Sequence, residues 1–154
     1  MTLHVHGLVG GHSGSEIDKG RANANILLGR LLFELHEALP FCIISVDGGD
    51  KDNAIPVDSK AEIVVSDEDI DEIQSLAAAF QEKVRSEFHV CDTVIAIDAD
   101  VSAEGGYEVF SMALTEKVIF MLMQVPNGIQ TMSADLPGLV ESSLNLGILK
   151  TTEE

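Results

Sequence analysis

The first residues of the chain alternate between apolar and polar side chains. Leu3 and Val5 fall on one side of an extended chain. His4 and His6 fall on the other side, because successive side chains of a strand point to opposite faces. Residues 2–9 are therefore predicted to form a half-buried strand, which a cluster of glycines then ends.

Three later segments have the periodicity of amphipathic helices. In each, apolar residues recur at intervals of three and four positions and make one buried stripe. The first helix is predicted over residues 21–39 and stops before Pro40. The second begins at Ser66 with a run of acids suited to a helix N-terminus, and its inner face extends to Val84. The third covers residues 107–123.

Further apolar, β-rich runs are predicted to be strands. They are residues 41–46, 61–65, 88–97, 129–132 and 142–151.

The order of these elements predicts an α+β fold. Strand, helix, strand, strand, helix and strand follow one another over residues 1–98, which is the order of a ferredoxin-like antiparallel sheet with two helices on one face. Residues 99–154 then add a helix and strands, which we interpret as a partial second α/β lobe. Because this lobe looks incomplete, we expect the chain to be a domain excised from a longer protein.

The charge balance limits the classes of partner. The formal net charge is −17, with only 9 Lys and Arg residues. Such an acidic surface repels nucleic acid and anionic lipid, so we expect neither as a partner. No apolar run reaches the ~18–20 residues of a membrane span. Cys42 and Cys91 lie in apolar runs and are interpreted as core residues of a protein in the reducing cytoplasm.

One histidine stands in the glycine-rich turn after the first strand. His12 could donate a hydrogen bond to an oxyanion or a carboxylate there. It could equally be a loop histidine that bonds its own turn, and the residue chemistry alone favours that structural role. The glycines match neither the Walker nor the Rossmann pattern. Ser13 lacks the elbow and the partner of a serine nucleophile.

A catalytic metal centre cannot be assembled from this sequence. His4 and His6 could chelate a metal from one strand face, but no further ligand is evident, so we assign them to a solvent-exposed face. The aspartate-rich residues 47–56 and 98–104 lack the spacing of calcium loops. If the protein is an enzyme, its chemical centre is expected outside this chain.

Four stretches resemble the aminoacyl-histidine dipeptidases, which are di-zinc metallopeptidases also called Xaa-His dipeptidases or bacterial carnosinases. They are GLVGGHSGSEI at residues 7–17, GRANAN at 20–25, DNAIP at 52–56 and GLVESSLNLG at 138–147. The resemblance covers essentially the whole chain. In that family a lid or dimerisation domain is inserted into a catalytic domain, and this chain resembles the inserted domain alone.

The resemblance implies roles for two residues. His12 matches the lid histidine that stabilises the tetrahedral intermediate, and Asn53 matches the lid asparagine that helps to hold the substrate. Both would act when the lid closes on the catalytic domain. The family's two zinc ions and its glutamate base belong to that catalytic domain, so no metal is expected in this chain.

The whole protein is accordingly expected to be a cytoplasmic, homodimeric zinc dipeptidase that hydrolyses Xaa-His dipeptides. Its partners would be the dipeptide substrate, the catalytic domain of the same protein and a second copy. The isolated chain is expected to be inactive. The alternative is a ferredoxin-like binding or oligomerisation module without catalysis.

Overall fold

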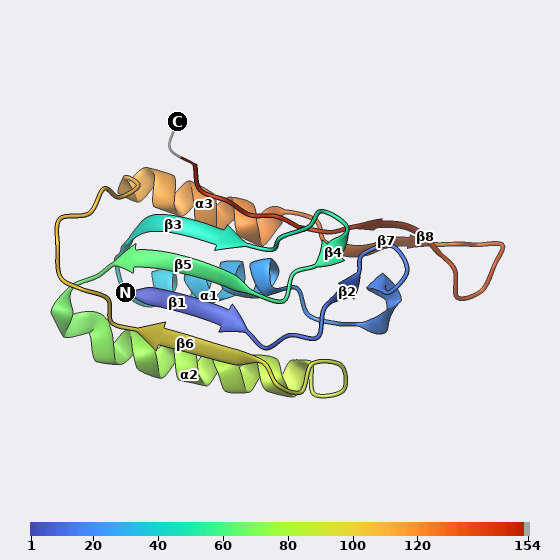
Figure 1. Cartoon of the computed structure of the whole chain (residues 1–154), viewed down its shortest axis with the longest axis horizontal. Helices are drawn as coiled ribbons and strands as arrows, with labels where there is room; N and C mark the ends of the chain where they lie inside the picture. Colours follow the sequence, from blue (N-terminus) through green and yellow to red (C-terminus); the bar gives the residue numbers. More distant parts are fainter. Residues whose placement is uncertain (153–154) are drawn as a thin grey trace.

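Strand β1 (Thr2–His6) is an interior strand of a four-stranded antiparallel sheet (Figure 1). The computed structural model describes residues 1–152. The strand order is β3-β5-β1-β6, and β1 is antiparallel to both of its neighbours. The other strands of the sheet are β3 (Cys42–Gly48), β5 (Ser59–Val64) and β6 (Ala96–Asp100).

Two helices connect these strands and lie together on one face of the sheet (Figure 1). Helix α1 (Ala24–Ala38) joins β1 to β3, and helix α2 (Ile70–Glu87) joins β5 to β6. A 3₁₀ turn, η2 (Asp67–Asp69), precedes α2. The connectivity and the strand order are those of a ferredoxin-like sheet, so the predicted fold class is confirmed.

The core lies between the sheet and the helices. Leu3 and Val5 are fully buried there, as the alternation along β1 predicts. The stripe of α1 supplies the largest share of the apolar side chains. Its buried apolar side chains are those of Ala24, Leu27, Leu28, Leu31, Leu32 and Leu35. The other face of the sheet carries the polar residues of β1.

The remaining elements extend beyond this sheet. Helix α3 (Met112–Gln124) packs against α1. Strands β7 (Gly128–Met132) and β8 (Val140–Leu144) form an antiparallel hairpin that projects away from the sheet (Figure 1). The proposed boundary between residues 98 and 99 falls inside β6, and the division into two lobes stays a prediction. No helix in residues 1–152 is long and apolar enough to cross a membrane.

The strand predicted over residues 88–97 is wrong except for its last two residues. Helix α2 ends at Glu87, turns follow, and β6 begins only at Ala96. The prediction assumed that the apolar residues of this run are buried in a strand, but Val90 and Val94 are exposed. Asp92, by contrast, is fully buried.

Two later boundaries also differ from the prediction. The third helix starts at Met112 instead of residue 107, because Ser111 caps it by accepting a hydrogen bond from the Leu114 amide. The strand predicted over residues 142–151 ends at Leu144. The chain beyond it returns to the edge of the main sheet, where Leu149 forms a bridge with Gly48 and the Thr151 hydroxyl bonds the backbone of Val46.

Candidate functional site

His12 and Asn53, which are 41 positions apart in the sequence, lie next to each other in space. Strand β2 (Gly11–His12) pairs with β4 (Ala54–Ile55), with His12 opposite Ala54. The Ser13 amide also donates to the carbonyl oxygen of Asn53 at 2.9 Å. Both His12 and Asn53 are exposed. The structure therefore brings the two predicted site residues to one exposed place on the surface.

The turn after β2 holds the imidazole of His12. Its Nδ1 atom accepts hydrogen bonds from the amides of Gly14 at 3.0 Å and Ser15 at 3.3 Å. A neutral imidazole has one donor and one acceptor nitrogen, so an accepting Nδ1 places the proton on Nε2. The turn thus selects the tautomer in which Nε2–H can donate to a ligand.

Glu16 and Arg21 fix the backbone of the same turn. One carboxylate oxygen of Glu16 accepts from the His12 amide at 2.9 Å, and the other accepts from Arg21 at 3.0 Å. Arg21 also donates to the carbonyl of Gly10. The His12 amide, followed by Arg21, holds the pKa of Glu16 below its ordinary value. Gly11 has a φ of +145°, which residues with side chains rarely adopt, and a Cβ there would lie 2.4 Å from Nη1 of Arg21, so the site favours glycine.

Asp92 joins the two ends of the long connection between β1 and α1. Its Oδ1 atom accepts from the Val9 amide at 2.6 Å, and its Oδ2 atom accepts from the Ala22 amide at 2.7 Å. The side chain comes from the turn after α2 and is fully buried. Asp92 therefore closes the base of the loop that carries His12.

Two asparagines, Asn145 and Asn23, position the backbone on either side of Asn53. Asn145 donates to the carbonyl oxygens of Asp52 at 3.3 Å and Ala54 at 2.8 Å, on either side of Asn53. The amide oxygen of Asn145 accepts from Asn23 at 3.2 Å. Asn23 in turn caps α1, because its Oδ1 atom accepts from the first amides of the helix.

No role was predicted from the sequence for Asp92, Asn23 or Asn145. Asn23 and Asn145 do lie in the stretches at residues 20–25 and 138–147 that carried the family resemblance. Their presence there is a signal that could have marked them. Asp92 had no such signal, since it stands in an apolar run that was interpreted as a strand.

A cleft of about 620 Å³ adjoins the β2–β4 pair, whose Gly11, Ala54 and Ile55 contribute to its wall. Charged side chains of both signs also line it, beside glycines and apolar residues. The charged residues are Asp47, Asp50, Asp58, Lys51, Lys60 and Lys150. His12 and Asn53 do not line this cleft, so the cleft lies beside the two candidate residues and does not enclose them.

Comparison with known proteins places the chain in a family. The model of the peptidase dimerisation domain matches residues 3–90, more than half of the chain. The chain belongs to the peptidase dimerisation domain family. The match runs from β1 to just beyond α2, and so covers all of the ferredoxin-like unit except β6.

Individual relatives extend the likeness over nearly the whole dimerisation domain. The domain is 35% identical over 151 residues to the cytosol non-specific dipeptidase of Escherichia coli K12. It is similar to the crystal structure of the aminoacylhistidine dipeptidase of Vibrio alginolyticus, with a TM-score of 0.94, 34% identity and 99% of the domain covered. The domain spans 31% of the length of each of these relatives.

Proposed function

We propose that this dimerisation domain is the lid of a longer, metal-dependent dipeptidase that hydrolyses Xaa-His dipeptides. The proposal rests on the names of the two relatives, which are both dipeptidases, and on the closeness of His12 and Asn53. The catalytic metal, two zinc ions by the resemblance, would be held in the length of the relatives that this chain does not span. We propose the cytosol as its location.

The observation that carries the proposal is the state of His12. Its Nδ1 atom is occupied by the Gly14 and Ser15 amides, so Nε2–H is the donor that it can present. Attack of water on a peptide carbonyl builds negative charge on the carbonyl oxygen. A hydrogen-bond donor that already points at that oxygen stabilises the transition state, because it need not reorient during the reaction. Such electrostatic stabilisation is the largest single contribution to rate enhancement in many hydrolases.

Asn53 supports the proposal from the adjacent position. Its exposed amide side chain has both a donor and an acceptor, as a group that holds a dipeptide backbone needs. The hydrogen bond from the Ser13 amide to the Asn53 carbonyl joins the backbone just after His12 to that of Asn53. Lid closure would therefore deliver both groups to the substrate in one movement. The metal, when bound, would activate the attacking water.

The role of His12 is tested in the full-length protein. His12→Ala is expected to lower kcat by about 10²–10³-fold, as loss of one oxyanion donor does, with little change in KM. The metal content should equal that of the parent protein. An unchanged kcat would remove His12 from the mechanism.

Two further variants control this test. His89→Ala removes another exposed histidine, whose Nδ1 atom contacts the Ser86 carbonyl at the end of α2, and should leave kcat unaltered. Asn53→Ala is expected to raise KM more than it lowers kcat, because Asn53 is proposed to hold the substrate. The opposite pattern for Asn53 would argue against a role in substrate binding.

The family description also supports a homodimer, and we propose that two copies of this domain associate. Light scattering on the full-length protein should give twice the mass of one chain. A monomer at micromolar concentration would contradict this part of the proposal.

A further inference from the structure

Two histidines stand side by side on the open face of β1. His4 and His6 alternate with the buried Leu3 and Val5, so they project from the face of the sheet opposite the core. Their rings stack with centroids 4.3 Å apart and planes 26° from parallel. The sequence alone identified this pair but found no further ligand near it.

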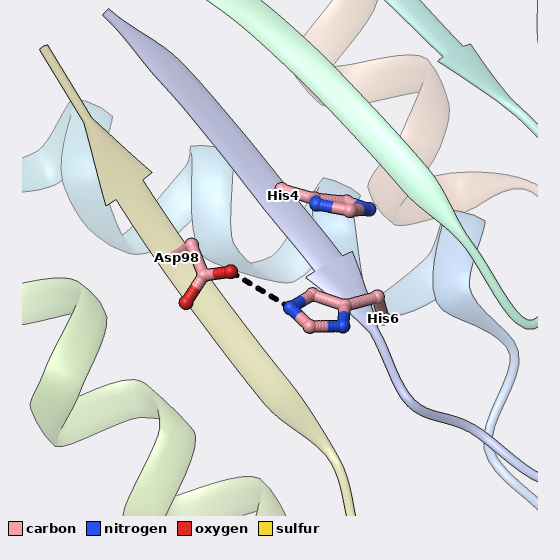
Figure 2. Close-up of side chains that lie close together, drawn as sticks. All are labelled: His4, His6 and Asp98. Carbon is pink, nitrogen blue, oxygen red and sulfur yellow. Dashed lines mark hydrogen bonds and ion pairs between the residues drawn. The ribbon is translucent and has the colours of Figure 1, made fainter.

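Strand pairing supplies carboxylates on both sides of the histidines. Asp98 on β6 stands opposite His4 in the register, and its Oδ2 atom lies 2.8 Å from Nε2 of His6 (Figure 2). On the other side, Oδ2 of Asp58 lies 2.5 Å from Nε2 of His4. The Asp58 contact occupies Nε2, so Nδ1 is the nitrogen that His4 can offer to a metal.

From this geometry we infer that His4, His6 and Asp98 form a binding site for a divalent transition metal, with zinc as the expected ion. One ligand atom from each of the three lies within 4.8 Å of the others. Tetrahedral zinc with bonds of 2.0–2.2 Å needs ligand atoms about 3.3 Å apart, a change that small side-chain rotations can supply. Two imidazoles and one carboxylate also suit zinc better than magnesium or calcium, which prefer oxygen ligands.

Asp58 has a separate place in this site. A metal-bound histidine commonly donates its other ring N–H to a carboxylate, which fixes the orientation of the ring and raises its basicity. Asp58 stands in that relation to His4. Asp58 is therefore a positioning residue that acts on the metal through His4.

The surrounding charges favour a cation. Asp58, just before β5, and both Asp98 and Asp100 on β6 face the histidines or flank them. The positive charge among these neighbours is that of Lys60, which stands opposite His4 in the strand register. One divalent ion can neutralise these carboxylates, and it would join β1 to the edge strand β6.

The test titrates Zn²⁺ into the 154-residue chain. Calorimetry should show one saturable site, and the ring ¹⁵N signals of His4 and His6 should shift while those of His36 and His89 stay in place. Mg²⁺ at the same concentration should produce neither effect. His6→Gln and Asp98→Asn should each weaken Zn²⁺ binding by more than tenfold, and Asp58→Asn by ~10–100-fold.

His89→Gln is the matched control, because it removes an exposed histidine away from the cluster and should leave the affinity unchanged. Circular dichroism of each variant checks that its fold is retained. Absence of saturable Zn²⁺ binding would overturn the assignment, as would binding that leaves the His4 and His6 signals unmoved. Equal losses of Zn²⁺ affinity in His89→Gln and His6→Gln would also overturn the assignment.

Discussion

The two short antiparallel pairs of this domain are held in opposite ways. Strands β2 and β4 have two residues each, yet side chains from three other parts of the chain fix their loops. Those side chains are Asp92, Arg21 and Asn145. Strands β7 and β8 have five residues each, but most of their residues are exposed. The length of a strand pair is therefore a poor guide to how firmly the segment is held. Contacts with side chains from other parts of the chain decide how firmly it is held.

The largest effect is expected from removing the buried carboxylate. Asp92→Ala leaves the Val9 and Ala22 amides without their acceptor, and each loss costs ~1–3 kcal/mol. We expect the free energy of unfolding in urea to fall by about 3 kcal/mol. Asp92→Asn, which retains one carbonyl oxygen, should lie between Asp92→Ala and the parent chain.

A matched change in the hairpin completes this comparison. Ser142→Ala on β8 alters an exposed side chain and should change the free energy of unfolding by no more than ~0.5 kcal/mol. Equal effects of Asp92→Ala and Ser142→Ala would show that the two pairs are held alike.

A smaller effect is expected at the cap of α1. Asn23→Ala removes the cap and the hydrogen bonds to Asn127 and Asn145, and should cost about 2 kcal/mol of unfolding free energy. Ser111→Ala removes the exposed cap of α3 and should cost about 1 kcal/mol. If Ser111→Ala proved the more costly of the two, the asparagine network would contribute nothing beyond capping.

The smallest effect is local and depends on pH. The pKa of Glu16 lies below its ordinary value of 4.5, chiefly because the His12 amide donates to the carboxylate, with Arg21 adding to the shift. A lowered pKa means that the carboxylate stabilises the turn above pH 4.5 and loses this contribution as the pH falls through the folded-state pKa.

This pH dependence can be followed at one amide. The His12 amide signal in NMR spectra should move as the pH falls below 4.5 and Glu16 gains a proton. Glu16→Gln should abolish the transition. A His12 amide that titrates identically in the variant would assign the effect to another group.

Sequence predicts the ferredoxin-like unit well because its signals are local. The alternation around Leu3 and Val5 and the leucine stripe of α1 each report burial within a few residues of the chain. The order of elements then restricts the sheet to very few topologies. Failures occurred where an apolar run was exposed, as at Val90 and Val94.

The candidate site was predictable only in part. His12 and Asn53 were found through motifs, but their adjacency depends on two strands too short to show a period. Asp98 completes the histidine cluster only through the pairing of β1 with β6. Asp92 reaches across 83 and 70 positions of sequence, and local patterns contain no information on such contacts.

The position of Asp92 has a consequence for how the domain folds. The His12 loop precedes α1, but its closing contacts with Asp92 span 83 and 70 positions of the chain. Contacts of such large sequence separation form slowly, since a long loop must close before they contribute any stability. We therefore expect the loop to become fixed late in folding, once the turn after α2 has brought Asp92 into place. A domain trimmed at residue 90, where the family match ends, would lose both β6 and the residue that closes this loop.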